Sequence, residues 1–115
     1  MNPLSWFKGL WSVRRDPRLT AQSEVWAREH FASNRLDVAS RVLAILVEQI
    51  GVEMSALLPT TRFIEDLDCV DLEGVEIVMA VEEEFAFTIP ALDAESIGTV
   101  AELIDYVQKR SQDRG

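Results

Sequence analysis

Cysteine and histidine are almost absent from this chain, and their scarcity excludes several kinds of site. Cys69 is the only cysteine among 115 residues, so neither an internal disulfide nor a cysteine-based metal cluster can form. His30 is the only histidine, which argues against a histidine-rich metal site and against a Ser-His-Asp triad. We interpret His30 as an ordinary surface or partly packed residue. The sequence therefore predicts no catalytic residues and no metal ligands.

Long apolar runs are also missing. No apolar stretch approaches the roughly 18 residues that a membrane-spanning helix needs, so none is expected. Near the N-terminus Lys8 interrupts the apolar residues and no small-residue cleavage site follows cleanly, so we expect no signal peptide. A chain without disulfides suits a reducing compartment. We therefore expect the protein to be cytoplasmic.

The whole chain has a net charge of −9, and basic side chains are scarce beyond its first third. Residues 1–36 hold six basic and three acidic side chains, a net charge of +3, whereas residues 37–115 hold five basic and 17 acidic ones, a net charge of −12. An acidic domain repels nucleic acid and anionic lipid, and it attracts partners with basic patches. We expect protein partners and no nucleic acid.

Residues 1–15 carry a short amphipathic pattern that ends in two arginines. Leu4, Phe7 and Trp11 recur at helical spacing, and Trp6 and Leu10 lie beside them. Aromatic residues beside a basic rim suit a membrane surface. A helix packed on the domain or on a partner is the interpretation that we favour over membrane contact, and a partly disordered tail is the third alternative.

Two helices are expected in the region that follows. The first begins near Thr20, an N-cap residue type, and ends at about residue 33. Its apolar side consists of Val25, Trp26 and Phe31. The second, residues 38–50, has Asp37 as its N-cap and ends before Gly51, a residue type that favours helix C-termini. Its apolar stripe consists of Val38, Val42, Ile45, Leu46 and Ile50. Four side chains are expected to hold the following loop, residues 52–62, against the core: Leu57, Leu58, Phe63 and Ile64.

The stretch 63–85 is the centre of the predicted fold. Asp71 can accept hydrogen bonds from the first free N–H groups of a helix, and its negative charge is favoured there by the helix dipole. The apolar residues at helical spacing are predicted to form a buried face: Leu72, Val75, Val78, Met79 and Phe85. An acidic stripe on another face consists of Glu73, Glu76 and Glu83, with Glu82 and Glu84 beside it.

The remainder predicts a short helical turn at residues 93–97 and a last helix at residues 100–109, which Thr99 caps. Three longer helices and one short helix, with a long first loop, make an all-α bundle. The expected domains are an N-terminal basic, Trp-rich helical extension (residues 1–36), the bundle (residues 37–110) and a polar tail (residues 111–115).

Several short motifs along this region resemble the acyl carrier proteins. The matching residues are Glu65-Asp66-Leu67, Leu72, the run from Val75 to Phe85, Ile89-Pro90, Ile97, Thr99-Val100 and the run from Ile104 to Val107. The resemblance covers about residues 37–110. It implies an acyl-carrier-protein-like four-helix bundle and a protein that is not itself an enzyme.

The resemblance stops at the family's Asp-Ser-Leu signature, whose serine carries the phosphopantetheine arm. The corresponding triplet here is Val70-Asp71-Leu72, and Asp68 replaces the usual glycine of the preceding loop. A carboxylate in place of the serine could form only an acyl phosphate, which hydrolyses readily. We therefore predict that Asp71 is unmodified, that phosphopantetheine is absent and that no other cofactor is bound.

The family's acidic helix faces basic patches on partner enzymes, and the matching residue types are kept here. The resemblance therefore implies a partner-recognition surface made of Asp71, Leu72, Glu73, Glu76, Met79, Glu82 and Glu83, with Met79 exposed between the glutamates. We predict a non-covalent docking or regulatory module for enzymes of acyl metabolism, of the fatty acid or polyketide type. Such contacts weaken with salt.

Two alternatives remain open. A true acyl carrier would need another attachment residue, for which Ser55, Ser96 and Ser111 are the candidates. A binder of a small hydrophobic ligand would use the interior of the bundle without a covalent arm.

Cys69 is interpreted as a partly buried, inert thiol, because the nearby carboxylates raise its pKa. The acidic residues around it match a calcium-binding loop only weakly.

Overall fold

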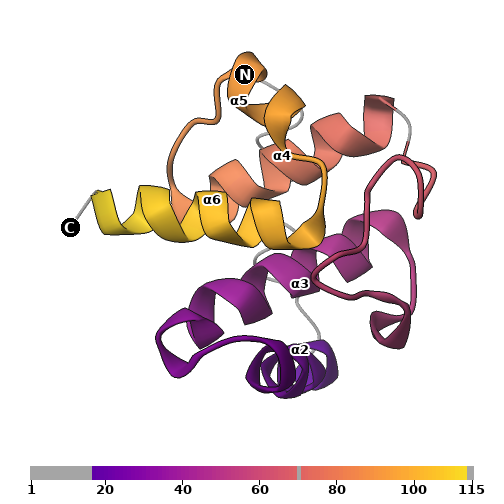
Figure 1. The fold of residues 1–115 in the computed structure, drawn as a ribbon, viewed down its shortest axis with the longest axis vertical. Coiled ribbons are helices and arrows are strands. Elements are labelled where there is room, and N and C mark those ends of the chain that lie inside the picture. The colour runs from indigo at the N-terminus through magenta and orange to yellow at the C-terminus, as the bar shows by residue number, and fades with distance from the viewer. Residues whose placement is uncertain (1–16, 70, 114–115) are drawn as a thin grey trace.

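The computed structural model describes residues 17–69 and 71–113, and within them it contains five α-helices and no strand. The helices are α2 (Pro17–His30), α3 (Leu36–Ile50), α4 (Asp71–Phe85), α5 (Ala91–Ser96) and α6 (Val100–Asp113), with two short 3-10 helices, η1 (Ser33–Arg35) and η2 (Met54–Ala56). The all-α fold class is confirmed, with three longer helices and one short helix following α2 (Figure 1). The expected helix at residues 1–15 lies outside the described residues.

Helix α3 occupies the middle of the molecule, with α2 packed on one side and α4 and α6 on the other (Figure 1). This position explains why α3 is apolar over most of its surface. Its buried residues are Val38, Ala39, Ser40, Val42, Leu43, Ala44, Ile45 and Leu46. The helix ends at Gly51, whose left-handed backbone (φ 78°) lets its N–H donate to the carbonyl of Val47. The predicted C-terminus of this helix is confirmed.

The N-terminus of α3 differs from the prediction. The helix begins at Leu36, one residue before Asp37, and Arg35 occupies the cap position without a side-chain hydrogen bond. The preceding turn η1 runs directly into α3, and the N–H of Arg35 already donates to the carbonyl of Ala32 at 2.9 Å. Asp37 therefore lies in the first turn, where its carboxylate accepts a hydrogen bond from Arg41 at 3.0 Å instead of capping the helix.

Helix α2 is fastened to the bundle by a tryptophan. Trp26 is buried, and its indole Nε1 donates to the carbonyl oxygen of Leu57 at 2.8 Å, which joins α2 to the long loop. The helix begins at Pro17 and ends at His30, three residues earlier at each end than predicted. Val25, expected on the apolar side, is 49% exposed, and Leu19, Ser23 and Ala27 are buried with Trp26 instead. His30 is exposed, as interpreted, with its ring centroid 4.6 Å from that of Trp26.

Helix α4 is rotated relative to the predicted orientation. Leu72 and Val75, predicted to be buried, are 67% and 52% exposed, and Val78 and Met79 are only half-buried. The face that packs into the core consists of Ile77, Ala80, Val81 and Phe85. At about 3.6 residues per turn, this set lies on largely the opposite side of the helix from Leu72 and Val75. Phe85 is the one predicted core residue of α4 that is fully buried.

The long loop between α3 and α4 is pinned to the start of α6. Arg62 and Thr99 form an isolated antiparallel bridge, and the N–H of Phe63 donates to the carbonyl of Gly98 at 3.0 Å. Thr99 caps α6 as predicted, because its hydroxyl accepts a hydrogen bond from the N–H of Glu102 at 3.1 Å. Of the side chains expected to hold the loop, Leu57 is buried and Phe63 half-buried, but Leu58 and Ile64 are 51% and 70% exposed.

The last two helices are longer than predicted. Helix α5 covers Ala91–Ser96, starting two residues before the predicted turn. Helix α6 continues past the predicted end at Lys109 to Asp113, so the first part of the expected polar tail is helical. The domain boundaries proposed from the sequence stay predictions.

Candidate functional site

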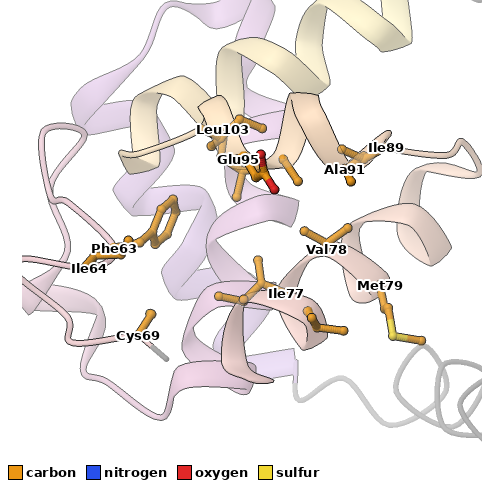
Figure 2. A pocket seen from close by; sticks show the side chains of 14 residues that line it. Phe63, Ile64, Cys69, Ile77, Val78, Met79, Ile89, Ala91, Glu95 and Leu103 are labelled. Carbon is orange, nitrogen blue, oxygen red and sulfur yellow. The ribbon is translucent and has the colours of Figure 1, made fainter. Parts of the chain in front are cut away.

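A groove opens between α4, α5 and the end of the long loop. Its volume is about 710 Å³, and its walls are mostly apolar. Figure 2 shows the three walls: Phe63 and Cys69 from the loop, Ile77 and Val78 from α4, and Ala91 from α5. We call this space the α4–α5 groove. Three of the residues that sequence periodicity assigned to the core, Val75, Val78 and Met79, line this groove.

The outer surface of α4 combines apolar and acidic side chains. Leu72, Glu76, Met79 and Glu83 follow one another at helical spacing, so they lie on one row of the helix. Leu72 and Glu83 are exposed, and Glu76 is half-buried. Met79, which helical spacing placed on the buried face and the resemblance placed on the recognition surface, is half-buried and borders the α4–α5 groove (Figure 2). We call this row, together with the half-buried Glu73, the acidic face of α4.

The other glutamates of α4 are engaged within the bundle. The carboxylate of Glu84 accepts a hydrogen bond from Nε of Arg41 at 2.7 Å, and Arg41 also lies over the Phe85 ring at 4.3 Å. The carboxylate of Glu82 accepts a hydrogen bond from the N–H of Ile89 at 2.8 Å. Glu82 was predicted to recognise partners, and this contact fixes its side chain toward the connection between α4 and α5.

Asp71, predicted as the N-cap and as part of the recognition surface, is the first residue of α4. Its side chain lies outside the described part of the structure, as does Val70. The loop before it is held by Arg62, whose backbone N–H and guanidinium both donate to the Asp66 carboxylate. These hydrogen bonds hold the pKa of Asp66 below its ordinary value. Asp68 has a left-handed backbone, with φ of 54°, a conformation that glycine adopts without strain.

Cys69 borders the α4–α5 groove and is partly buried, as predicted. Burial raises the pKa of its thiol above the ordinary value, and the carboxylates of Glu73 and Asp68 raise it further. A thiol with a raised pKa is mostly protonated at neutral pH and is a poor nucleophile. The geometry agrees with the interpretation of Cys69 as an inert thiol.

Helix α5 forms one wall of the groove without burying any of its own residues. Its attachment to α6 includes a polar contact: the Tyr106 hydroxyl donates to the Asp93 carboxylate at 2.6 Å, and Arg110 donates to the Tyr106 oxygen at 2.8 Å. Arg110 also lies over the Phe87 ring at 4.7 Å. Burial and the hydrogen bond to Asp93 raise the pKa of Tyr106. No sequence signal predicts the contact between Tyr106 and Asp93, because the two residues are 13 positions apart and belong to different helices.

None of the candidate serines belongs to α4. Ser55 is exposed in η2, and Ser96 is exposed at the end of α5, where its hydroxyl donates to the carbonyl of Asp93 at 2.7 Å. Ser111 is half-buried in α6. Ser40 is buried in α3 and donates to the carbonyl of Asp37.

A metal site and a membrane-spanning helix are both absent from the described residues. Across residues 17–69 and 71–113, no group of three or more His, Cys, Asp or Glu side chains is placed to hold a metal ion. None of the described helices is both long and apolar enough to cross a membrane.

The features described above lie within a stretch that matches a known protein family. Residues 40–107 match the family model described as the phosphopantetheine attachment site. The chain belongs to this family. The matched range begins inside α3 and ends inside α6, so it contains the long loop, the acidic face of α4 and the α4–α5 groove. Domains of this family are carrier proteins rather than catalysts, and they interact with partner enzymes.

Proposed function

We propose that this carrier-protein-like domain docks non-covalently on enzymes that recognise carrier proteins, and that no phosphopantetheine arm is attached to Asp71. The observation that carries the proposal is the acidic face of α4. Its Leu72 side chain is 67% exposed one turn from Glu76, and Val75 on the same side is 52% exposed, rather than packed in the core. An exposed large apolar residue among like charges is typical of a recognition surface.

The chemistry at the start of α4 supports the absence of the arm. Attachment in this family requires a hydroxyl, and the helix begins with the carboxylate of Asp71. The serines of the matched range are Ser40, Ser55 and Ser96, of which Ser40 is buried and the other two lie in η2 and α5. The aspartate at the start of α4 therefore does not fit attachment of phosphopantetheine. Asp71 instead places a negative charge where the family's arm begins with a phosphate.

Charge favours a basic partner. Glu73, Glu76 and Glu83 lie on one part of α4, within a segment (residues 37–115) whose net charge is −12. Charges at such a surface mainly increase the association rate and select the partner, and their effect falls with ionic strength. The favoured partners are enzymes of acyl metabolism with a basic docking patch.

The test for the arm is the intact mass of the chain after co-expression with a broad-specificity phosphopantetheinyl transferase. We expect no mass increase. An increase equal to one phosphopantetheine would contradict the proposal, and peptide mapping would then show whether Ser55, Ser96 or Ser111 carries it, which would support a true carrier.

The test for docking is charge reversal on α4. We expect Glu76→Lys with Glu83→Lys to reduce the affinity for acyl-metabolism enzymes retained on the immobilised chain by tenfold or more, because like charges then face each other. Glu48→Lys with Glu53→Lys is the matched control, since both side chains are exposed and lie outside α4. Equal retention by the two double variants would contradict docking through α4.

The α4–α5 groove favours a second candidate function, binding of a small hydrophobic ligand. Its volume of about 710 Å³ lies in the range of ligand pockets, roughly 300–1,000 Å³. Titration with a fatty acid would then shift the NMR signals of Val78 and Ile89, two residues that line the groove. Shifts confined to the outer surface of the molecule would argue against this function.

A further inference from the structure

The α4–α5 groove has an apolar floor and a rim that is open to solvent. Three buried side chains line the floor, Ile77, Ile89 and Leu103. At the rim, Ile64 and Val75 line the groove and are exposed. A ligand would therefore meet apolar side chains at the floor and solvent at the rim. This arrangement suits a molecule with an apolar chain and a polar end.

Glu95 is the one charged side chain among the described residues that line the groove, and none of these residues is basic. It lies on α5 and is exposed, so its carboxylate belongs to the rim. Figure 2 shows this carboxylate among the other side chains that line the groove. Within the described part of the chain, no residue forms an ion pair with Glu95. A ligand can therefore use it.

The segments that build most of the groove are strongly acidic. Residues 52–99 comprise the long loop, α4 and α5, and they hold 12 acidic side chains and one basic side chain, a net charge of −11. The basic residue is Arg62, whose guanidinium is already paired with Asp66 at 3.0 Å. On α6 the first basic residue is Lys109, in the second half of the helix, whereas the groove is lined by a residue near the start of α6. Little positive charge therefore offsets the carboxylates.

This negative charge extends to the wall of the groove at Cys69. Burial raises the pKa of the thiol most, and the charges of Glu73 and Asp68 raise it further. The N-terminus of α4 carries roughly half a positive charge, but Asp71 and Glu73 both belong to its first turn and outweigh it. The potential at the groove is therefore negative, so it attracts cations and repels carboxylates.

We propose that the α4–α5 groove binds small amphiphiles with an alkyl chain and a cationic head, such as a long-chain primary amine, in preference to free fatty acids. The chain lies against the apolar floor, and the head lies beside Glu95 at the rim. A carboxylate in the same place would face Glu95 and the surrounding acidic segments, and like charges at short range repel. The inference rests on the second candidate function, ligand binding in the groove, and adds to it the charge of the ligand.

The test compares octylamine, octanol and octanoate, which share one alkyl chain, by NMR titration of the full chain at neutral pH. Under this condition the amine is cationic and the acid is anionic. The shifts of Val78 and Ile89 report on the groove, because both residues line it. We expect octylamine to bind about tenfold more tightly than octanoate, with octanol between them, because opposite charges attract and like charges repel at the rim.

Two variants and a change of salt locate the charge that is responsible. Glu95→Gln removes the charge at the rim, so the preference for the amine should fall from about tenfold to about threefold or less, with an unchanged affinity for octanol. Glu48→Gln is the matched control, since Glu48 is also exposed and lies on α3, outside the groove. It changes the net charge by the same amount and should keep the preference. Added salt should reduce the preference in the wild type by screening.

The outcomes distinguish this inference from the function on which it rests. Equal affinities for octylamine and octanoate, or tighter binding of octanoate, would overturn the inference and leave hydrophobic ligand binding in place. An equal loss of preference in both variants would overturn it in favour of an effect of net charge. Octylamine shifts confined to Glu76 and Glu83 would overturn it in favour of adsorption to the acidic face of α4. If none of the three ligands shifts Val78 or Ile89, the inference and the second candidate function both fail.

Discussion

The two halves of α4 have different surroundings although they belong to one helix. In the C-terminal half, residues 79–85, Ala80, Val81 and Phe85 are buried. In the N-terminal half, residues 71–78, Ile77 is the one described residue that is buried, and Leu72 and Val75 are exposed. The difference shows that the second half of the helix holds it in the bundle, and this leaves the apolar residues of the first half available for binding.

Electrostatic contacts follow this division only in part. Glu84 in the C-terminal half is bound by Arg41, and Glu82 accepts a hydrogen bond from Ile89. Their carboxylates are used within the fold. Glu76, in the N-terminal half, and Glu83, which is exposed although it lies in the second half, belong to the acidic face. Under the docking proposal, a partner bound to the first half would leave the contacts of the second half in place. Three substitutions test this comparison and a fourth tests the neighbouring attachment of α5, beginning with the largest expected effect.

Phe85→Ala should cause the largest loss of stability. The side chain is 8% exposed and lies under the Arg41 guanidinium, so its removal leaves a cavity in the core. We expect a loss of about 3–5 kcal/mol in the free energy of unfolding, measured by urea denaturation. Leu72→Ala, in the exposed half, is the control and should change it by less than about 0.5 kcal/mol. Similar losses in both variants would remove the distinction between the two halves.

Arg41→Gln should have the next largest effect. The side chain of Glu84 is only 12% exposed, and the substitution removes the charged partner of its carboxylate. Leaving a mostly buried charge poorly paired costs about 1–3 kcal/mol. The loss should appear in denaturation curves, and Arg41→Gln combined with Glu84→Gln should recover part of it. No recovery in the double variant would mean that Arg41 acts through Phe85 rather than through Glu84.

Tyr106→Phe should weaken the attachment of α5 to α6. The lost hydrogen bond to Asp93 is worth about 0.5–1.5 kcal/mol, and hydrogen exchange should increase in α5 and not in α3. Because the pKa of Tyr106 is raised in the folded state, its contribution is complete below the unfolded pKa of about 10 and is lost as the pH rises through the folded value. The stability difference between wild type and variant should therefore shrink at high pH. A constant difference across that range would contradict this assignment.

Gly74→Ala should produce a small change of opposite sign. Gly74 lies in the N-terminal half of α4, and a Cβ there would meet nothing within 4 Å. Replacing a helical glycine by alanine stabilises by about 0.5–1 kcal/mol, measurable as a higher midpoint of thermal unfolding. A destabilised variant would show that this half of the helix is packed more closely than its exposure indicates.

Local signals predicted the ends of several elements well. Gly51 ends α3 through its left-handed backbone, and Thr99 caps α6 through a side-chain hydrogen bond. Each of these contacts joins residues within four positions of one another in the sequence. Asp37 shows the limit of such signals. An aspartate before an apolar stretch is a common N-cap, but the turn η1 continues into α3 and moves the helix start.

The orientation of α4 could not be read from its sequence because the helix has apolar residues on two sides. Leu72 and Val75 recur at helical spacing as regularly as Ile77 and Val81. Which side faces the core is decided by contacts with α3, which is distant in the sequence. The acidic residues of the site could be selected from sequence, whereas the groove depends on three segments that only the fold brings together.

The hydrogen bond from Trp26 to Leu57 joins a residue outside the family match to one inside it. The family match begins at residue 40, yet an indole contributed by residue 26 satisfies a carbonyl within it and covers part of α3. The stretch that the family model matches therefore does not include all the residues that pack against it. Residues 40–107 transferred alone into another polypeptide would keep the whole stretch that matches the family but would lose the indole hydrogen bond of Trp26.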